Sequence, residues 1–222
     1  KTSDTYDYIF GLIFGNTLST QSSFTFSPGG TRFFVGGSSI STAAVTAGSL
    51  ADEIGVDVYL ANAATTFGIG SNHDLKISGN VTSGGATVTK NGAGTLIFSG
   101  TNTYAASTTI TAGTLQLGDG SSSGSLNPAS PVSITGGTFA INQDDTVTQG
   151  TDFSGAAITG SGTFAVKGGA MVVLTNSATF NDLLGVSVAS DSFLNLNFTG
   201  TDIIASLDLG AGPVAAGEYG RI

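Results

Sequence analysis

Residues Lys90–Tyr104 read KNGAGTLIFSGTNTY, with a short apolar core, Leu96-Ile97-Phe98, set among glycines, threonines and asparagines. Related segments follow further along the chain: ITAGTLQL (110–117), ITGGTFAI (134–141) and ITGSGTFAV (158–166). Each of these has a β-branched residue, a small-residue turn that ends in Gly-Thr, and a strand of alternating apolar residues. The opening stretch matches their second half, so it is one unit of an internal repeat.

The turn glycines set the period of the repeat. They are 19, 24 and 25 residues apart, at Gly94, Gly113, Gly137 and Gly162. The chain must turn a corner in every unit, often with φ > 0, and glycine adopts that conformation without a clash at Cβ. The pattern therefore predicts a regular corner before each strand.

Weaker copies extend the pattern in both directions. Leu75-Lys76-Ile77 and Leu194-Asn195-Leu196 have the same apolar-x-apolar form, and their first leucines are 119 residues apart, or five intervals of about 24 residues. Alternation places the apolar residues on one face, with Ile97 as an exception on the other. The expected outer positions are Lys76, Gln116, Ala140, Ala165 and Asn195.

A unit of about 24 residues cannot bury its apolar face alone, but stacked units can, with strands of successive coils about 4.8 Å apart. The sequence therefore predicts an all-β fold, a parallel β-solenoid (β-helix). An antiparallel β-sandwich is the alternative, because it also has short strands every 8–12 residues or so. Sandwiches rarely repeat one turn and strand in sequence, and the chain has a single Asn-Gly hairpin signal, Asn91-Gly92.

The composition argues against several classes of function. The net charge is −9, and the six basic residues are scattered singly, so the basic stripe that a nucleic-acid partner requires is missing. The chain has one histidine and no cysteine, which makes a zinc site improbable. The apolar run Tyr8–Phe14 is too short to cross a bilayer as a helix, so we expect no membrane-spanning segment.

Residues 1–65 fit the repeat poorly, and we expect them to form a β-rich N-terminal cap or assembly segment, continuous with solenoid coils over residues 66–222. An extended apolar segment at a terminus can add as a strand to the sheet edge of a neighbouring molecule. Repeated head-to-tail addition would give an open filament of identical subunits. The candidate assembly strand comprises Tyr6, Tyr8, Ile9, Phe10, Leu12, Ile13 and Phe14.

Residues Val88–Gly120 resemble the autotransporter-associated β-strand repeat, also called the passenger-associated transport repeat. Mild departures are Val88 and Phe98, each in place of leucine, and Ala106 in place of glycine. The resemblance implies a right-handed parallel β-helix in a secreted or surface-exposed bacterial protein, without catalytic residues in the repeat. The matching residues include Lys90, Gly92, Gly94, Thr95, Leu96, Gly100, Asn102, Thr103, Tyr104, Gly113, Thr114 and Leu115.

The sequence offers few candidate catalytic residues. Glycoside hydrolysis needs two carboxylates across a cleft, whereas the adjacent acids Asp52-Glu53 and Asp144-Asp145 point to opposite faces of a strand or lie in solvated turns. His73 has no nucleophile context, and we expect it at the surface or in a turn. We therefore predict no catalytic residue, no metal and no cofactor.

Two functions remain in view. The first is an extracellular structural protein whose subunits self-assemble head-to-tail into a surface fibre. The alternative is a monomeric autotransporter-type passenger that acts as an adhesin or glycan-binding module. In that case Thr and Asn ladders with Tyr59 or Tyr104 would contact a glycan or another cell-surface ligand.

Overall fold

The computed structural model describes residues 8–9, 12–14, 25–26, 33–45, 48–121 and 124–210, the first three ranges by their backbone alone. These residues form strands and turns without a helix, and all of their strand pairings are parallel. The sequence prediction of an all-β, parallel β-solenoid is therefore confirmed, and the antiparallel sandwich is excluded.

The strands form four sheets. The first sheet contains, in order, β1 (Tyr8–Ile9), β4 (Phe33–Val35), β7 (Val58–Leu60) and β10 (Val81–Ser83). The second contains β2 (Leu12–Phe14), β5 (Ser39–Thr42), β8 (Ala64–Gly68), β11 (Thr87–Asn91), β13 (Thr108–Ile110), β15 (Val132–Ile134) and β18 (Thr159–Gly160).

The third sheet contains β3 (Thr25–Phe26), β6 (Leu50–Ile54), β9 (His73–Ile77), β12 (Thr95–Phe98), β14 (Thr114–Leu117), β16 (Thr138–Asn142), β19 (Thr163–Lys167), β21 (Gly185–Val188) and β23 (Ser206–Asp208). The fourth contains β17 (Thr146–Thr148), β20 (Met171–Leu174) and β22 (Phe193–Leu196).

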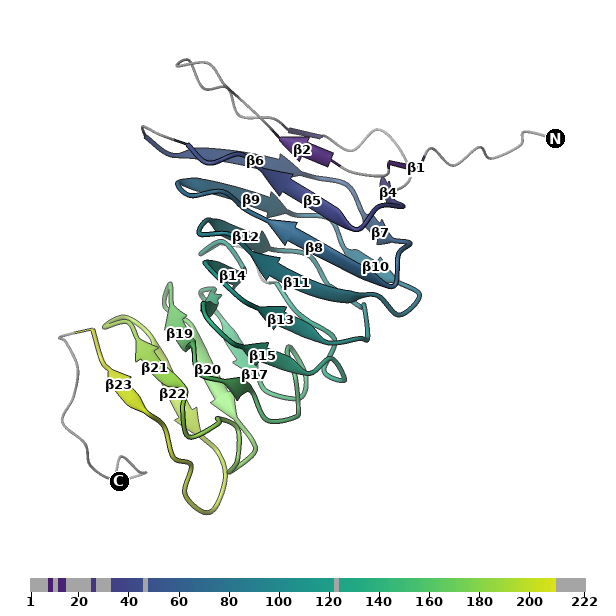
Figure 1. Cartoon of the computed structure of the whole chain (residues 1–222). Helices are drawn as coiled ribbons and strands as arrows, with labels where there is room; N and C mark the ends of the chain where they lie inside the picture. Colours follow the sequence, from purple (N-terminus) through teal and green to yellow (C-terminus); the bar gives the residue numbers. More distant parts are fainter. Residues whose placement is uncertain are drawn as a thin grey trace.

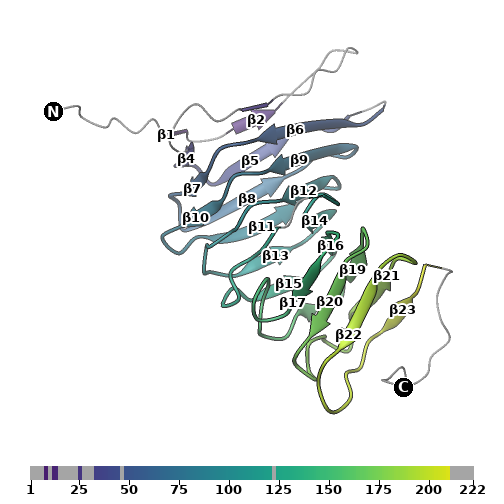
Figure 2. The ribbon, with the colours of Figure 1, turned by 180° about the vertical axis from the view of Figure 1, so that it is seen from behind.

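Each coil of the N-terminal half visits the first, second and third sheets in turn, so that β7, β8 and β9 make one coil and β10, β11 and β12 the next. Figures 1 and 2 show these coils stacked along one axis. From β6 to β23, register partners along the third sheet are 19–25 residues apart, in agreement with the predicted period, whereas those of β3 and β6 are 28 residues apart. The inner row of that sheet contains Leu75, Leu96, Leu115, Phe139, Phe164, Val186 and Leu207.

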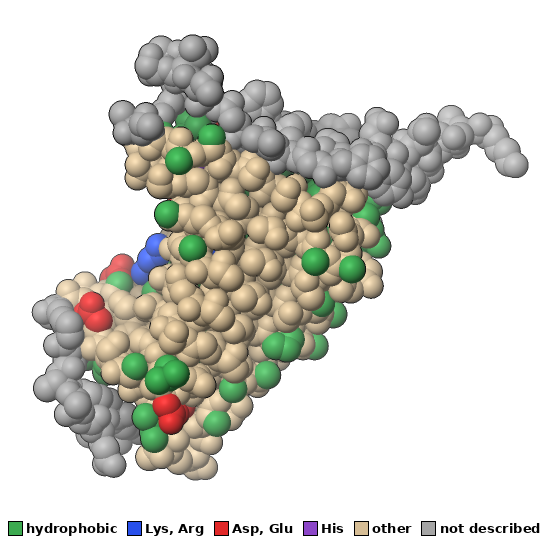
Figure 3. All heavy atoms as spheres, in the orientation of Figure 1, with side chains coloured by type: hydrophobic (Ala, Val, Ile, Leu, Met, Phe, Trp, Pro, Cys, Tyr) green, Lys and Arg blue, Asp and Glu red, His purple; other side chains and the backbone are tan. Residues whose placement is uncertain are grey.

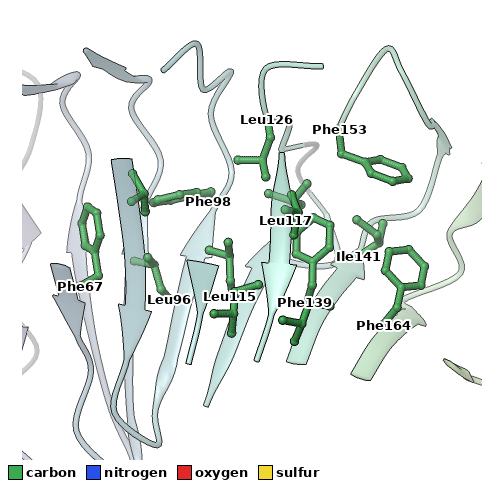
Figure 4. Close-up of a cluster of buried hydrophobic side chains, with 14 of the residues drawn as sticks. Phe67, Leu96, Phe98, Leu115, Leu117, Leu126, Phe139, Ile141, Phe153 and Phe164 are labelled. Atoms are coloured by element: carbon green, nitrogen blue, oxygen red, sulfur yellow. The ribbon is translucent and has the colours of Figure 1, made fainter. Parts of the chain in front are cut away.

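The core lies inside the coils, where the alternating apolar residues of all the sheets meet (Figure 4). Phe98 packs edge-to-face against Phe67, with ring centroids 5.9 Å apart, and Phe139 packs in the same way against Phe164 at 5.9 Å. The first contact joins the second and third sheets across the core, and the second joins register partners in neighbouring coils of the third sheet. Burial of this area, at roughly 25 cal/mol per Å², is the main source of stability.

The turn glycines act mainly through close backbone contacts. Of the four glycines in the predicted corners, Gly113 has φ of 64°, whereas Gly94 is outside the positive-φ region. A Cβ on Gly94 would lie 2.1 Å from the carbonyl oxygen of Gly70, and one on Gly113 would lie 2.3 Å from that of Gly92. The expectation of φ > 0 is therefore corrected for Gly94, as it is for Gly137 and Gly162. These positions need glycine because adjacent coils approach too closely for a side chain.

The predicted position of Leu194-Asn195-Leu196 is wrong. These residues lie in β22, which pairs with β20 in the fourth sheet, and Val186-Ser187-Val188 of β21 follows β19 in the third sheet instead. After β16 the chain forms β17, the first strand of the fourth sheet. The stack of coils bends in this region (Figure 1). A short apolar-x-apolar pattern identifies a half-buried strand but not the sheet to which it belongs.

The N-terminal predictions lie only partly within the described residues. The boundary between residues 65 and 66 falls inside β8, and Tyr6 and Phe10 lie outside the described part of the chain. The backbone of β1 pairs with β4, and that of β2 pairs with β5. The division of the chain at residue 65 and the role of this segment between subunits stay predictions.

Candidate functional site

Lys90 of the repeat motif points into the solenoid. It is fully buried, and its Nζ donates hydrogen bonds to the carbonyl oxygens of Asn91 (2.9 Å), Gly92 (2.8 Å) and Ala112 (3.1 Å). Burial lowers the pKa of the Lys90 ammonium to about 8. The lysine links its own corner to the corner of the next coil, so its role is structural.

Asn102 connects three successive coils. Its Oδ1 accepts a hydrogen bond from the backbone N–H of Val81 (2.9 Å), and its Nδ2 donates to the carbonyl oxygens of Gly100 (3.0 Å) and Ser125 (2.8 Å). In place of a regular strand this coil has an irregular segment here, paired by a single bridge between Thr101 and Ser125. The buried amide satisfies backbone groups that a continuous strand would otherwise pair.

Tyr104 is also buried. Its hydroxyl lies 3.0 Å from Thr108 Oγ1, and its ring packs edge-to-face against Phe98, with centroids 6.4 Å apart. Burial raises the pKa of this phenol. The hypothesis that Tyr104 contacts a glycan is therefore wrong, because no surface of its ring is available to a ligand.

The remaining motif residues also serve the stacking of coils. Thr95 and Leu96 of β12 pair in register with Thr114 and Leu115 of β14. The backbone N–H of Thr103 donates to the carbonyl oxygen of Val81. A Cβ on any of the motif glycines would lie 2.1–2.4 Å from a carbonyl oxygen of a neighbouring turn, and these glycines are Gly92, Gly94, Gly100 and Gly113.

His73 is buried, which corrects the expectation of a surface or turn position. Its Nε2 lies 2.8 Å from the Asp52 carboxylate and its Nδ1 lies 3.0 Å from the carbonyl oxygen of Ala43. Asp52 occupies an inner position beside Leu75 of the next coil. The signal in the sequence was the alternation Leu50-x-Asp52-x-Ile54, which places the acid on the apolar side. The pair joins β6 to β9 inside the stack, and we assign it a structural role.

The outer row of the third sheet is partly covered. Lys76 forms an ion pair with Asp119 at 2.7 Å, and the backbone N–H of Gly120 donates to the carbonyl oxygen of Asn142. The loop after β14 therefore reaches across β12 to β9, two coils earlier, and to the end of β16 in the next coil. Gln116 and Ala140, expected on the outer face, are buried beside this loop, whereas Ala165 remains half-buried, as do Lys76 and Ile97.

The first surface hollow, with a volume of about 260 Å³, lies near the bend. Its polar lining includes Thr101, Gln143, Asp145 and Asp152. Gln143 Nε2 donates to the carbonyl oxygen of Gly124, and Asp152 Oδ2 accepts from the backbone N–H of Thr148, so both groups are already engaged in the backbone framework.

The second hollow, of about 230 Å³, lies at the corner between the first and second sheets. Tyr59 forms one wall, and the other side chains that line it are small, apolar or amide. The lining contains no charged residue. Of the two tyrosines proposed as glycan contacts, Tyr59 is thus the one that reaches a surface hollow.

Large apolar side chains are exposed near the C-terminal end. Met171 and Phe193 are register partners on the outer side of the fourth sheet, and Phe193 is 64% exposed. Leu183, Ile203 and Leu209 are exposed in the same coils, where Figure 3 shows hydrophobic side chains at the surface. The described part of the chain has no helix that is long and apolar enough to cross a membrane.

Comparison with known proteins places the repeat in a family. Residues 88–117 match the family model described as passenger-associated-transport-repeat. The chain is 34% identical over 100 residues to the adhesin BmaC autotransporter of Brucella suis biovar 1 (strain 1330), a match that covers 43% of this chain and 3% of that relative. No solved structure matches the chain. The chain thus carries, in strands β11 to β14, a passenger-associated transport repeat of the kind associated with autotransporters.

Proposed function

We propose that the chain is an extracellular, autotransporter-type passenger segment, a β-solenoid rod that carries adhesive surface at the bacterial exterior. The observation that supports this most is the repeat at residues 88–117, whose lysine, asparagine and tyrosine all turn inward to hold coils together. Because these motif side chains are buried and bonded between coils, the motif favours a structural, non-enzymatic role. The similarity to an adhesin autotransporter supports the adhesive part of the proposal.

The proposal is tested by surface display. The chain is fused as the passenger of an autotransporter display system in a non-adherent bacterium, and display is quantified with an antibody. We expect adherence to host cells to rise severalfold over the empty display system. The Leu96→Asp variant, which should not fold, serves as the control for non-specific stickiness. Full display of the folded chain without a gain in adherence would contradict the adhesive role.

A second candidate function is the head-to-tail filament. The exposed apolar residues of the last coils, Phe193 and Ile203 among them, favour it, because contact with a further subunit would remove their side chains from water. Strands β22 and β23 each pair on one side within the described chain, so they offer edges to a further coil.

Electron microscopy of the purified chain over a concentration series tests the filament. We expect fibres that lengthen with concentration, and their loss in Phe193→Ser, in Ile203→Ser and after removal of residues 1–15. Ile97→Ser, an outer-face change in the middle of the rod, is the matched control and should leave fibres intact. Single short rods at every concentration would exclude the filament and leave the monomeric passenger.

A further inference from the structure

We propose that the hollow beside Tyr59 is a subsite for a single uncharged sugar ring. This inference rests on the proposed adhesive function and gives it a ligand class and a location. The site begins with an aromatic row on the outer face of the first sheet. Phe34 and Tyr59 are register partners on that face, with ring centroids 5.4 Å apart and planes inclined at 50°.

The backbone register of the first sheet extends one coil further along the rod axis. The backbone of Tyr8 is in register with Phe34 of the following coil, which is in turn in register with Tyr59. Figure 3 shows hydrophobic side chains along the right-hand edge, where β7 and β10 lie in Figure 1. A half-buried tyrosine combines an apolar ring with a polar hydroxyl, a combination that is enriched at interaction surfaces.

Two glycines shape the hollow next to Tyr59. A Cβ on Gly84 would lie 3.2 Å from the Tyr59 hydroxyl oxygen, so a side chain there would press on the phenol. Gly85 has φ of 128° and open space around its Cα, which leaves the mouth of the hollow clear. Ala61 and Ala63, which also line the hollow, have small side chains that do not fill it. The arrangement makes room for a flat ligand beside the ring.

The chemistry of the lining selects the ligand. A pyranose ring has a face of C–H groups and an edge of hydroxyl groups. The Tyr59 ring offers an apolar face to the first, and the Asn62 amide offers both a donor and an acceptor to the second. The lining thus combines an aromatic ring and small side chains with one amide, and placed polar groups beside apolar surface are usual in a small-molecule site.

The charge of the lining and of the whole chain restricts the class of sugar that the hollow can bind. The lining of this hollow is uncharged, whereas the hollow near the bend contains Asp145 and Asp152. A chain with a net charge of −9 repels anionic glycans, and the lining supplies no cation to offset that repulsion. The hollow therefore fits neutral sugars such as glucose, galactose or N-acetylglucosamine rather than sialylated or sulfated ones.

The test uses the full chain and a panel of neutral oligosaccharides that end in glucose, galactose or N-acetylglucosamine, with sialylated and sulfated analogues for comparison. Binding is measured by titration calorimetry, and the contact face by saturation-transfer NMR. We expect at least one neutral sugar to bind, with signal transferred to protons on one ring face. Tyr59→Ala and Asn62→Ala should each weaken binding at least tenfold, and Tyr59→Phe should stay within about threefold.

Thr109→Ala, an outward change on the second sheet, is the matched control and should bind as the unaltered chain does. Thermal melts of every variant separate loss of binding from loss of fold, and Tyr59→Phe keeps the test valid if Tyr59→Ala is unstable. The proposal is overturned if no neutral sugar binds, or if Asn62→Ala and Tyr59→Ala bind normally. Adherence of displayed cells that survives both changes would overturn this site while leaving the adhesive function in place.

Discussion

The coils of the repeat and the last coils of the rod use the same strand pattern with different results. In β12 the inner residues Leu96 and Phe98 are completely buried, because strands pair on both sides. In β22 the inner residues Leu194 and Leu196 remain half-exposed, and the outward Phe193 is largely open to solvent. The two regions therefore have the same alternation of apolar and polar residues. The number of neighbouring coils determines how far the inner apolar side chains are buried.

The two regions also differ in their polar groups. In the repeat, the buried Lys90 and Asn102 are each held by three hydrogen bonds to backbone groups. In β22, Asn195 is exposed to solvent. Polar residues of the repeat thus maintain the spacing of coils, whereas those near the end lie on the surface. Substitutions should be costly in the first region and mild in the second.

The largest effect is expected for Leu96→Asp. An unpaired carboxylate inside the stack should cost more than about 4 kcal/mol of unfolding free energy and remove the cooperative thermal transition. Ile97→Asp, on the outer face of the same strand, should cost about 1 kcal/mol or less. Phe193→Asp in the last coils should be equally mild. Circular dichroism melts measure all three, and a normal melt for Leu96→Asp would refute the register of the third sheet.

Gly94→Ala comes next. Its Cβ would lie 2.1 Å from the Gly70 carbonyl oxygen, so the coils must move apart, at a cost of about 3 kcal/mol. Gly68→Ala is the control, because its Cβ would meet Ser41 Cβ at an ordinary 3.6 Å. Chemical denaturation should separate the two variants clearly. Equal stabilities would mean that close approach is not the reason for glycine at residue 94.

Asn102→Ala should have a smaller effect. It removes the acceptor for the Val81 N–H and both donors to carbonyl oxygens, and leaves buried backbone groups without partners, at a cost of about 2 kcal/mol. Asn195→Ala, at the exposed end, should change the unfolding free energy by less than about 0.5 kcal/mol. Hydrogen exchange at Val81 reports the lost bond directly, and unchanged protection there would contradict the proposed role.

Lys90 should produce the smallest effect, a dependence of stability on pH. Its pKa is about 8 in the folded chain and 10.5 ordinarily, so between these values the unfolded chain holds a proton that the folded chain lacks. Stability therefore rises as pH increases from 8 towards 10. The carbonyl oxygens around Nζ favour the charged form and partly offset burial, which leaves a gain of about 1–2 kcal/mol.

The rise should end near pH 10. Burial raises the pKa of Tyr104, so above its ordinary value of 10.0 the unfolded chain loses a proton that the folded chain keeps, and stability falls. Lys90→Met should remove the rise between pH 8 and 10. Lys76→Met should keep it, because the hydrogen bond with Asp119 raises the pKa of Lys76. Melting temperatures over this range provide the test, and a rise that persists in Lys90→Met would have another source.

Much of the fold follows from the sequence because two signals coincide in the repeat. Alternation around Leu96 and Leu115 fixes the inner face, and the Gly-Thr turn fixes where each coil begins. Leu194 has alternation without that turn, and its assignment to the third sheet failed. Regular stacking is thus predictable where the corner and the strand are both marked.

The sites were less predictable, because they depend on contacts between coils. The burial of His73 requires Asp52, which lies 21 residues earlier and joins it only when the coils stack. Lys90 was recognised as a motif residue, but its inward direction became visible through its register partners Phe67 and Ile110. The hollow beside Tyr59 depends on Gly84, a position with no side chain to mark it.

The pairing of each coil with its immediate neighbours has a mechanical consequence. Strands of the third sheet bond to the preceding and following coils, so tension applied along the axis loads these interfaces in series. The last coils, whose inner residues are half-exposed, are the first to separate. Each released coil of about 20 residues lengthens the tether by roughly 70 Å, at about 3.4 Å per residue. If the rod is anchored at the cell surface as proposed and is loaded along its axis, we expect it to lengthen in steps while the coils of the repeat stay folded.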